Sequence, residues 1–254
     1  MNFTDKVILI TGGSSGIGAN AAIEMSKLGG KVVIIGRNES RLNEIADRIK
    51  AAGSPTPLVI VADVTTDAER IINEAIHHFG KINVLVNNAG IALTKNIQDS
   101  TMEEFDRVMN TNLRSVVLLT KLSVPHLEKT KGNIINISSI AGSVVIPTLP
   151  FYSISKAGMN LFTQSAAVEY GPKHIRVNAI APGIIDTPIF DTVGLTGEKR
   201  EMLMRNIISR YPIGRMGVVD DVTNAIIYLA SDLASFITGT VLRVDGGAVP
   251  ASAY

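Results

Sequence analysis

Two side chains capable of acid–base chemistry stand four residues apart in the segment Tyr152-Ser153-Ile154-Ser155-Lys156. Positions i and i+4 share one face of a helix, so the phenol and the ammonium can point into the same space. A free tyrosine has a pKa of about 10 and is a poor base at neutral pH. A neighbouring ammonium favours the phenolate and lowers that pKa. The pair could therefore give a proton to a developing alkoxide or remove one from an alcohol. The alternative is an ordinary surface pair.

Polar side chains also end two strand-like runs upstream of this pair. One run finishes with Ser139 and the other with Asn87-Asn88-Ala89-Gly90. Ligands of open α/β sheets bind at the carboxyl edge, where such runs end. A serine hydroxyl there can hydrogen-bond a substrate oxygen. The alternatives are a strand-end cap for Ser139 and a simple turn for the Asn-Gly segment.

A glycine-rich turn follows the first strand-like run and opens a helix. Glycines permit a tight turn and let backbone N–H groups approach a pyrophosphate, which the helix N-terminus attracts. The spacing is longer than the usual G-x-G-x-x-G, and a glycine turn by itself is weak evidence for a nucleotide. The turn reads Thr11-Gly12-Gly13-Ser14-Ser15-Gly16-Ile17-Gly18.

The end of the second strand-like run bears on the choice of cofactor. An acidic residue there would bind the adenosine ribose, but the sequence has Gly36 followed by Arg37. A guanidinium can instead pair with a 2′-phosphate. We therefore predict NADP, with NAD as the alternative. The competing interpretation is that Arg37 is a solvated loop residue.

Short apolar runs alternate with amphipathic stretches, which predicts one α/β domain over residues 1–254 with a parallel sheet covered by helices on both faces. The segment 186–210 interrupts the alternation and is predicted to be a substrate-loop insert. The predicted strands are Val7–Ile10, Val32–Ile35, Leu58–Val61, Val84–Val86, Ile134–Ile137, Val177–Ile180 and Val241–Val244. The predicted helices are Gly16–Leu28, Glu39–Ala52, Asp67–Phe79, Thr101–Leu127, Ser153–Tyr170 and Asp220–Ser231.

Composition narrows the possible partners. The 254 residues carry a net charge of +1, 46% hydrophobic residues and no cysteine. This balance favours neither nucleic acid nor a membrane surface, and no apolar run is long enough to span a bilayer. No metal-ligand spacing is present. We expect a cytoplasmic protein without disulfides.

Taken together and in order, these motifs resemble the short-chain dehydrogenase/reductase family, in its branch of about 250 residues. The resemblance covers residues 5–249, nearly the whole chain. It implies a Rossmann-type doubly wound sheet with strand order 3-2-1-4-5-6-7, and a homotetramer with one interface formed by Ser153–Tyr170 and Thr101–Leu127. The motifs that carry it are Thr11–Gly18, Asp63-Val64, Asn87–Gly90, Asn112, Ser139, Tyr152–Lys156, Pro182-Gly183 and Asp245-Gly246-Gly247.

The resemblance also implies roles for individual residues. Tyr152 would be the acid/base, Lys156 would lower its pKa and bind the nicotinamide ribose, Ser139 would polarise the substrate carbonyl, and Asn112 would hold a water. Asp63 would accept from the adenine amino group. The expected cofactor-binding set is Gly12, Ser14, Ser15, Gly16, Ile17, Gly18, Arg37, Asp63, Val64, Asn88, Ala89, Gly90, Tyr152, Lys156, Pro182, Gly183, Ile185 and Thr187. Relatives that use NADP often have a basic residue where Ser15 stands, which weakens the NADP prediction.

The sequence therefore predicts an oxidoreductase that moves a hydride between a nicotinamide cofactor and a carbonyl or secondary alcohol, with an apolar substrate. The substrate prediction follows from the expected pocket walls. One alternative is a 3-oxoacyl-carrier-protein reductase, for which Lys129, Lys131 and Lys173 could dock the acidic carrier. The other is a cofactor-binding scaffold or redox sensor without turnover. The predicted walls are Ile91, Leu93, Ile140, Ile146, Leu149, Ile185, Ile189, Phe190 and Met202.

Overall fold

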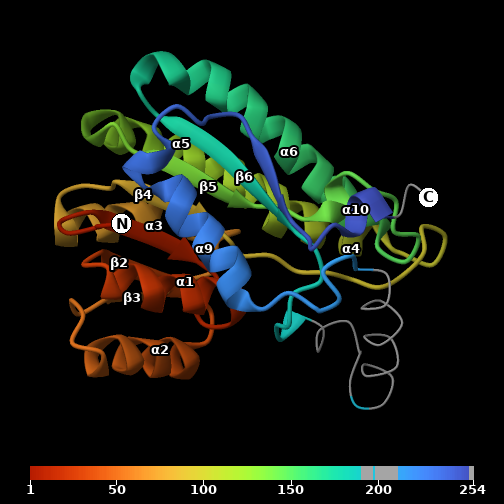
Figure 1. Ribbon diagram of the computed structural model, residues 1–254, viewed down its shortest axis with the longest axis horizontal. Helices are drawn as coiled ribbons and strands as arrows, with labels where there is room; N and C mark the ends of the chain where they lie inside the picture. Colours follow the sequence, from red (N-terminus) through yellow and green to blue (C-terminus); the bar gives the residue numbers. More distant parts are fainter. Residues whose placement is uncertain (190–196, 198–210, 252–254) are drawn as a thin grey trace.

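The computed structural model describes residues 1–189, 197 and 211–251. Its centre is a seven-stranded parallel sheet in the order β3-β2-β1-β4-β5-β6-β7 (Figure 1). Both the doubly wound fold and the predicted strand order are confirmed. The strands are β1 (Val7–Thr11), β2 (Lys31–Gly36), β3 (Leu58–Val61), β4 (Val84–Asn87), β5 (Asn133–Ile137), β6 (Arg176–Pro182) and β7 (Val241–Val244).

The strands form where runs rich in Val and Ile can be buried on both sides, because helices cover both faces of the sheet. All five residues of β1 and all five of β5 are buried. The pairing is in register across the centre, with Ile8 opposite both Val32 and Val84. Since every pair is parallel, the carboxyl ends of β1, β4, β5 and β6 meet at one edge.

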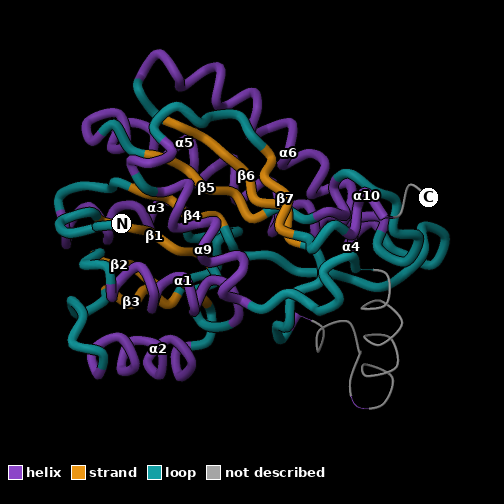
Figure 2. The backbone as a smooth tube through the Cα atoms, viewed as in Figure 1, coloured by secondary structure: helices purple, strands orange, loops and turns teal. Residues whose placement is uncertain are grey.

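Helices cover the sheet on both faces, which Figure 2 shows as purple coils around the orange strands. The core between the sheet and α1, α2 and α9 contains Ile23, Leu42 and Ile226. The core on the other face, against α3, α5 and α6, contains Ile71 and Leu127. These helices are α1 (Gly16–Lys27), α2 (Glu39–Ala51), α3 (Ala68–Phe79), α5 (Ser115–Thr130), α6 (Pro150–Tyr170) and α9 (Val219–Ala230).

Two helices differ from the sequence-based prediction in ways that affect the site. The single helix predicted at 101–127 consists of α4 (Met102–Met109), a π-helical segment (Asn110–Arg114) and α5. The helix expected to begin at Ser153 begins at Pro150, whose fixed φ suits the first turn of a helix. Tyr152 therefore lies on the helix rather than in the loop before it.

Most of the predicted insert at 186–210 lies outside the described residues, as do Phe190 and Met202. A short helix, α10 (Ala248–Ala251), ends the described chain. Among the described residues, the longest apolar helix falls short of what a bilayer crossing would require.

Candidate active site

Tyr152 and Lys156 share the first turns of α6, beside the carboxyl end of β5. Lys156 is only 3% exposed, and its Nζ donates to the backbone carbonyl of Ile137 at 2.7 Å. The same nitrogen lies 5.5 Å from the centroid of the Tyr152 ring. Helical spacing thus brings the phenol and the ammonium into one space, and the strand end anchors the ammonium there.

Burial governs the titration of both groups. It raises the pKa of Tyr152, while contact with the Ser139 hydroxyl acts in the opposite direction. It lowers the pKa of Lys156 from 10.5 to about 8. This direction is opposite to the lowered tyrosine pKa expected from the sequence, because the loss of water on burial outweighs the hydrogen bond from Ser139. Tyr152 is a phenol at neutral pH, ready to donate a proton.

Asn112 reaches this pair from the π-helical segment. Its Oδ1 accepts from the Ile91 N–H at 2.9 Å, and its Nδ2 donates to the Ile91 carbonyl at 2.9 Å and to Ser155 Oγ at 3.1 Å. Ser155 Oγ in turn donates to the Tyr152 carbonyl at 2.7 Å. Asn112 is fully buried within this π-helical segment, and such segments recur at functional sites. Asn112 thereby joins the helix of Tyr152 to the loop after β4.

Gly90 lies where these groups converge. A Cβ at this position would stand 3.4 Å from Asn112 Oδ1 and 3.7 Å from Lys156 Nζ. Asn112 Oδ1 keeps a second lone pair, since it accepts only from Ile91 among the described residues. The two polar atoms thus border the same small space beside a glycine.

Ser139 follows β5 and caps the turn after the strand, which is one of the two roles that its position suggested. Its Oγ accepts from the Ala141 N–H at 3.1 Å and caps the 3₁₀ turn Ile140–Gly142. The hydroxyl proton is not used by this bond, so Ser139 can donate it to the Tyr152 oxygen or to a ligand oxygen. Since Ser139 also contacts the Tyr152 phenol, one hydroxyl both caps the turn and faces the acid.

The glycine-rich turn is held in place by Thr11 and Asn88. Asn88 Nδ2 donates to the carbonyl of Thr11 at 2.9 Å, and Thr11 Oγ1 accepts the N–H groups of Asn88 and Ala89 at 2.9 and 3.0 Å. A side chain at Gly12 or Gly18 would collide with Asn88 Nδ2, at 2.7 and 2.4 Å. Asn88 and Ala89 therefore support the turn from the end of β4.

The N-terminus of α1 is open, which is what an anion site requires. Its N-cap residue, Ser15, is extended but makes no capping hydrogen bond, and the first turn has no acidic residue. By contrast, Thr101 and Glu104 form a capping box at α4. The uncapped N–H groups and the positive φ of Gly16 (54°) fit a pyrophosphate. Residues Ser14, Ser15, Gly16 and Ile17 supply this end.

The segment after β6 packs onto that opening. Methyl and Cβ atoms of Thr187 lie 3.3 and 3.4 Å from where a Gly16 side chain would begin. Pro182 ends the strand, and the N–H of Gly183 donates to the Val244 carbonyl at 2.9 Å. The side chains of Ile185 and of Val64, which follows β3, are both buried, at 5% and 6% exposure.

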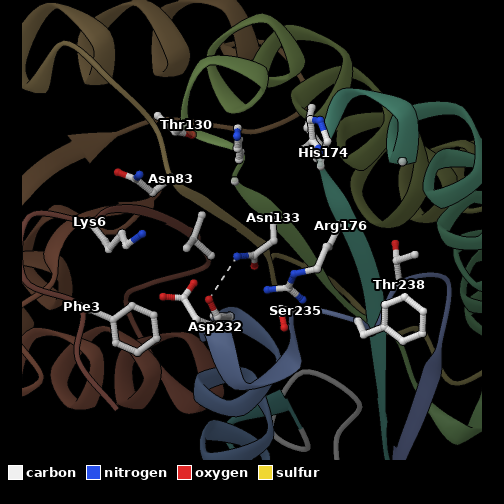
Figure 3. Close-up of a pocket in the computed structure, with 17 residues that line it drawn as sticks. Phe3, Lys6, Asn83, Thr130, Asn133, His174, Arg176, Asp232, Ser235 and Thr238 are labelled. Atoms are coloured by element: carbon white, nitrogen blue, oxygen red, sulfur yellow. Dashed lines mark hydrogen bonds between the residues drawn. The ribbon is translucent and has the colours of Figure 1, made fainter.

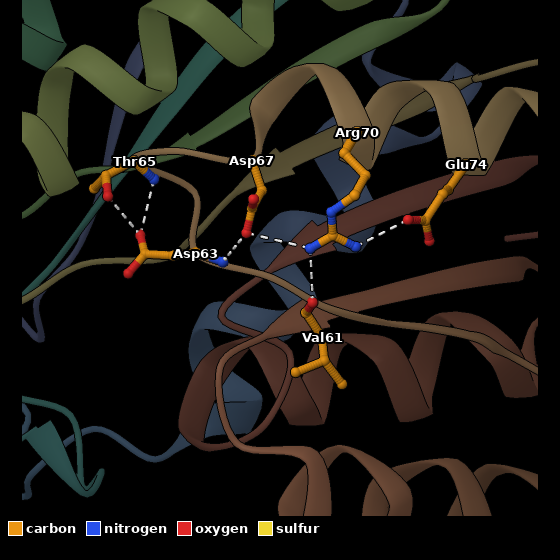
Figure 4. Close-up of polar contacts among 6 residues, drawn as sticks. All are labelled: Val61, Asp63, Thr65, Asp67, Arg70 and Glu74. Carbon is orange, nitrogen blue, oxygen red and sulfur yellow. Dashed lines mark hydrogen bonds and ion pairs between the residues drawn. The ribbon is translucent and has the colours of Figure 1, made fainter.

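Arg37 and Asp63 form an ion pair at the ends of β2 and β3. Arg37 Nη1 lies 3.6 Å from Asp63 Oδ2 and its side chain is 73% exposed. Although burial opposes ionisation, hydrogen bonds from the Thr65 N–H and hydroxyl, together with Arg37, hold the pKa of Asp63 below its usual value. Figure 4 shows that the N–H and the hydroxyl of Thr65 both donate to the Asp63 carboxylate. Arg70 forms ion pairs with Asp67, in the same turn, and with Glu74.

The predicted residues thus fall into three groups along one sheet edge: the acid–base group, the glycine turn with the α1 opening, and the Arg37–Asp63 pair. Sequence reasoning missed the residues that hold them. Ser155 lies inside the Tyr-x-x-x-Lys segment, and Thr11 begins the turn, but neither has a spacing signal of its own. Asn160 Oδ1 accepts a hydrogen bond from the Ser138 hydroxyl at 2.6 Å, and nothing in the sequence pattern indicates this contact either.

Comparison with known proteins agrees with this geometry. The family model described as enoyl-(acyl carrier protein) reductase matches residues 12–249. A 3-oxoacyl-[acyl-carrier-protein] reductase of Thermotoga maritima is 34% identical over 98% of this chain and 100% of its own. A short-chain dehydrogenase/reductase of unknown function from Caenorhabditis elegans, solved with cofactor, superposes with a TM-score of 0.93 at 35% identity, covering 98% of this chain and 96% of that one. A glucose dehydrogenase of Caenorhabditis elegans gives 0.86 at 39% identity, covering 98% and 100%.

The chain belongs to the short-chain dehydrogenase/reductase family. It is an oxidoreductase of the kind that works with a nicotinamide cofactor.

Proposed function

We propose that this enzyme interconverts a carbonyl and a secondary alcohol, with Tyr152 as acid/base and Ser139 and Lys156 as its partners. The observation that carries the proposal is the partly buried Tyr152 phenol, in contact with Ser139 and beside an ammonium anchored on Ile137. A non-catalytic scaffold has no use for a phenol that is kept protonated at this edge of the sheet.

In the reducing direction, Tyr152 gives its proton to the substrate oxygen as negative charge develops there, and Ser139 donates a hydrogen bond to the same oxygen. A bound nicotinamide supplies or accepts the hydride. Lys156 stabilises the resulting phenolate by its charge. Asn112 holds a water beside Gly90, through its free lone pair, and this water returns a proton to the site.

The variant Tyr152→Phe tests this assignment. We expect kcat to fall by about 10³-fold, because loss of a positioned general acid costs about 10²–10⁴-fold. Cofactor affinity, measured by nicotinamide fluorescence, should change little. The exposed Tyr228→Phe is the matched control. Normal turnover in Tyr152→Phe would refute the mechanism.

For the cofactor we propose NADP(H), with NAD(H) as the alternative. Arg37 supports this choice because it directly follows β2 with an exposed guanidinium, and no carboxylate ends that strand. Asp63 weakens the expected preference for NADP(H) over NAD(H). Its carboxylate already pairs with Arg37 and would repel a 2′-phosphate.

Fluorescence titration of both reduced cofactors tests the choice. Arg37→Ala should weaken NADPH binding by about tenfold and leave NADH unchanged, as expected for one lost charge-assisted contact. Asp63→Asn removes the competing charge, so the ratio of NADPH to NADH affinity should rise. The exposed Arg41→Ala serves as the control. Tighter NADH binding in the wild type, unchanged in Arg37→Ala, would overturn the proposal.

For the substrate we propose an apolar ketone or alcohol. The loops that follow β4 and β5 are joined by a hydrogen bond from the Lys95 N–H to the Thr148 carbonyl at 3.0 Å. These loops carry the partly buried Ile91, Ile140 and Leu149. A screen with both cofactors should give a higher kcat/KM for apolar ketones than for sugars. Because one similar structure is a glucose dehydrogenase, a higher kcat/KM for glucose than for apolar ketones would contradict the proposal.

The carrier-protein alternative is favoured by the Thermotoga maritima relative. The lysines first suggested as its docking patch do not support it, however. Lys129 lies in the last turn of α5, Lys131 follows that helix, and Lys173 precedes β6 and pairs with Glu128 at 3.2 Å. All three therefore lie at the amino edge of the sheet, away from Tyr152. Reduction of acyl-carrier substrates but not of free ketones would nevertheless establish this alternative.

We also propose a homotetramer, with α5 and α6 at one interface. Three large apolar side chains on α6 are exposed at intervals of seven residues: Ile154, Leu161 (66%) and Val168 (81%). Residues at this interval line one face of a helix, and an exposed apolar stripe marks an association surface.

A further inference from the structure

The turn that carries Ser139 is tied to the helix of Tyr152 by the side chain of Asn160. Asn160 lies on α6 four residues after Lys156 and eight after Tyr152, so the three side chains follow one side of the helix. Its amide contacts a residue on each side of Ser139, namely Ser138 before it and, further along the turn, Gly142. The helix that carries the acid therefore also holds the segment that carries the Ser139 hydroxyl.

The two hydrogen bonds of the Asn160 amide differ in length. The Ser138 hydroxyl donates to Asn160 Oδ1 at 2.6 Å, and it also lies 3.3 Å from the Lys156 carbonyl. Asn160 Nδ2 donates to the Gly142 carbonyl at 3.4 Å. Because a carbonyl can only accept, this second contact fixes the orientation of the amide. Ser138 is 3% exposed, so water has little access to replace Asn160 as its partner.

The turn after β5 also packs directly on the backbone of α6. A Cβ at Gly142 would stand 2.7 Å from the Lys156 carbonyl carbon, so the approach depends on glycine. The Gly142 N–H donates to the Ser139 carbonyl at 3.0 Å, and the Ala141 N–H donates to Ser139 Oγ at 3.1 Å. A displacement of Gly142 from α6 would therefore also displace the Ser139 hydroxyl.

The strand that leads to Ser139 has a separate anchor at its other end. Figure 3 shows Asn133, the first residue of β5, whose Nδ2 donates to the Ala230 carbonyl of α9 at 3.1 Å. Asn133 is 6% exposed, and its Oδ1 has no hydrogen-bond partner in the part of the chain that the structure describes. This anchor lies at the amino edge of the sheet, so it holds the strand without acting on the turn at the carboxyl edge.

We propose that Asn160 is a positioning residue that holds the Ser139 hydroxyl at the place where it meets Tyr152. The inference rests on the proposed function, in which Ser139 and Tyr152 act on one substrate oxygen. Two donors must converge on that oxygen, and a displacement of about 1 Å in such a group can cost about 10²-fold in rate. Asn160 acts through Ser138 and Gly142 and is not itself a catalytic residue.

The contact between Ser139 and Tyr152 can be measured without turnover. NMR of protein labelled with carbon isotope at tyrosine Cζ, near neutral pH and without cofactor, gives a Tyr152 signal that is identified by its loss in Tyr152→Phe. Ser139→Ala removes the hydrogen bond and provides the reference shift. Asn160→Ala should move the signal in the same direction. It should have no further effect in the Ser139→Ala background, because residues that act through one contact are not additive.

Steady-state kinetics gives a second readout that a general loss of structure would not reproduce. Asn160→Ala should lower kcat by about tenfold with little change in KM, since the Ser139 bond strengthens as charge develops on the substrate oxygen. In the Ser139→Ala background the same substitution should cost less than about twofold. Asn160→Asp keeps an acceptor for Ser138 and should retain more activity than Asn160→Ala.

The matched control is Asn133→Ala, which removes a comparable asparagine bond at the other end of β5. It should leave the Tyr152 signal and kcat unchanged. Alanine is the most favourable residue in a helix interior, so Asn160→Ala should keep α6 intact, and unchanged cofactor affinity checks this. Ser138→Ala removes the shorter bond from the strand side, should give the same shift, and replaces Asn160→Ala if that variant does not fold.

Two results would overturn the proposal. One is a Tyr152 signal that stays in place in Asn160→Ala, and the other is a shift of equal size with and without the Ser139 hydroxyl. Both are read from the cofactor-free protein. They are therefore distinct from normal turnover in Tyr152→Phe, which would refute the proposed mechanism.

Discussion

In the proposed mechanism the Lys156 side chain must carry a positive charge, and it must also be buried to lie beside Tyr152. Its ammonium is anchored on the Ile137 carbonyl, yet burial brings its pKa down to about 8. A depressed lysine pKa means that the unfolded chain binds more protons between pH about 8 and about 10.5, so the contribution of this residue to stability rises across that window.

The variant Lys156→Met removes this pH dependence. At neutral pH the charged, buried lysine costs up to about 3 kcal/mol, at about 1.4 kcal/mol per pKa unit, so the variant should be more stable although inactive. The advantage should shrink as the pH rises from about 8 to about 10.5. Denaturant unfolding at several pH values measures it. A constant difference between variant and wild type would contradict the lowered pKa.

At the scale of elements, α1 lacks the stabilisation that a side-chain cap would provide, and the N–H groups of its first turn are left without a side-chain acceptor. Serine is a preferred N-cap residue, yet Ser15 makes no cap bond. An acidic residue in that place would cap the helix and complement its dipole, and would also repel a pyrophosphate.

We therefore predict opposite effects of Ser15→Asp on stability and on binding. The free energy of unfolding should rise by about 1 kcal/mol, the usual value of a good cap. Affinity for the reduced cofactor should fall by at least about tenfold, as expected for a buried like-charge contact. Ser15→Asn, a neutral cap, should lose much less affinity. Undiminished cofactor binding by Ser15→Asp would argue against an anion at this helix end.

At the scale of the whole molecule, the outer face of α6 remains uncovered. This helix runs along the outer surface of the fold (Figure 1) and carries the stripe of Ile154, Leu161 and Val168. Burying such a stripe against a second copy removes apolar area from water, at about 25 cal/mol per Å².

If the proposed tetramer uses this face, the double variant Leu161→Glu/Val168→Glu should shift the protein to smaller species, since a buried, unpaired carboxylate is costly. Sedimentation velocity at several concentrations measures the shift. Asn43→Glu, on the exposed side of α2, should leave the assembly intact. A tetramer unchanged by both substitutions would exclude α6 from the interface.

The sequence by itself determined the class of fold and the positions of most candidate site residues along one edge of the sheet. Continuous β-branched runs can be buried only in a covered parallel sheet, so the alternation of strands and helices identified the doubly wound fold. The i, i+4 spacing placed Tyr152 and Lys156 on one helical face, and strand ends placed Ser139 and Gly90 at one edge. These signals are local, and local periodicity is readable from a chain.

Only the tertiary structure decided what surrounds those residues. The direction of the tyrosine pKa shift depends on burial, which spacing does not report. The pairing of Arg37 with Asp63 joins two strand ends that are adjacent only in the sheet. The π turn at Asn112 and the unpaired Asn133 Oδ1 are equally non-local, because each depends on contacts between distant segments. Charge state and hydrogen-bond satisfaction are properties of an environment, and folding creates that environment.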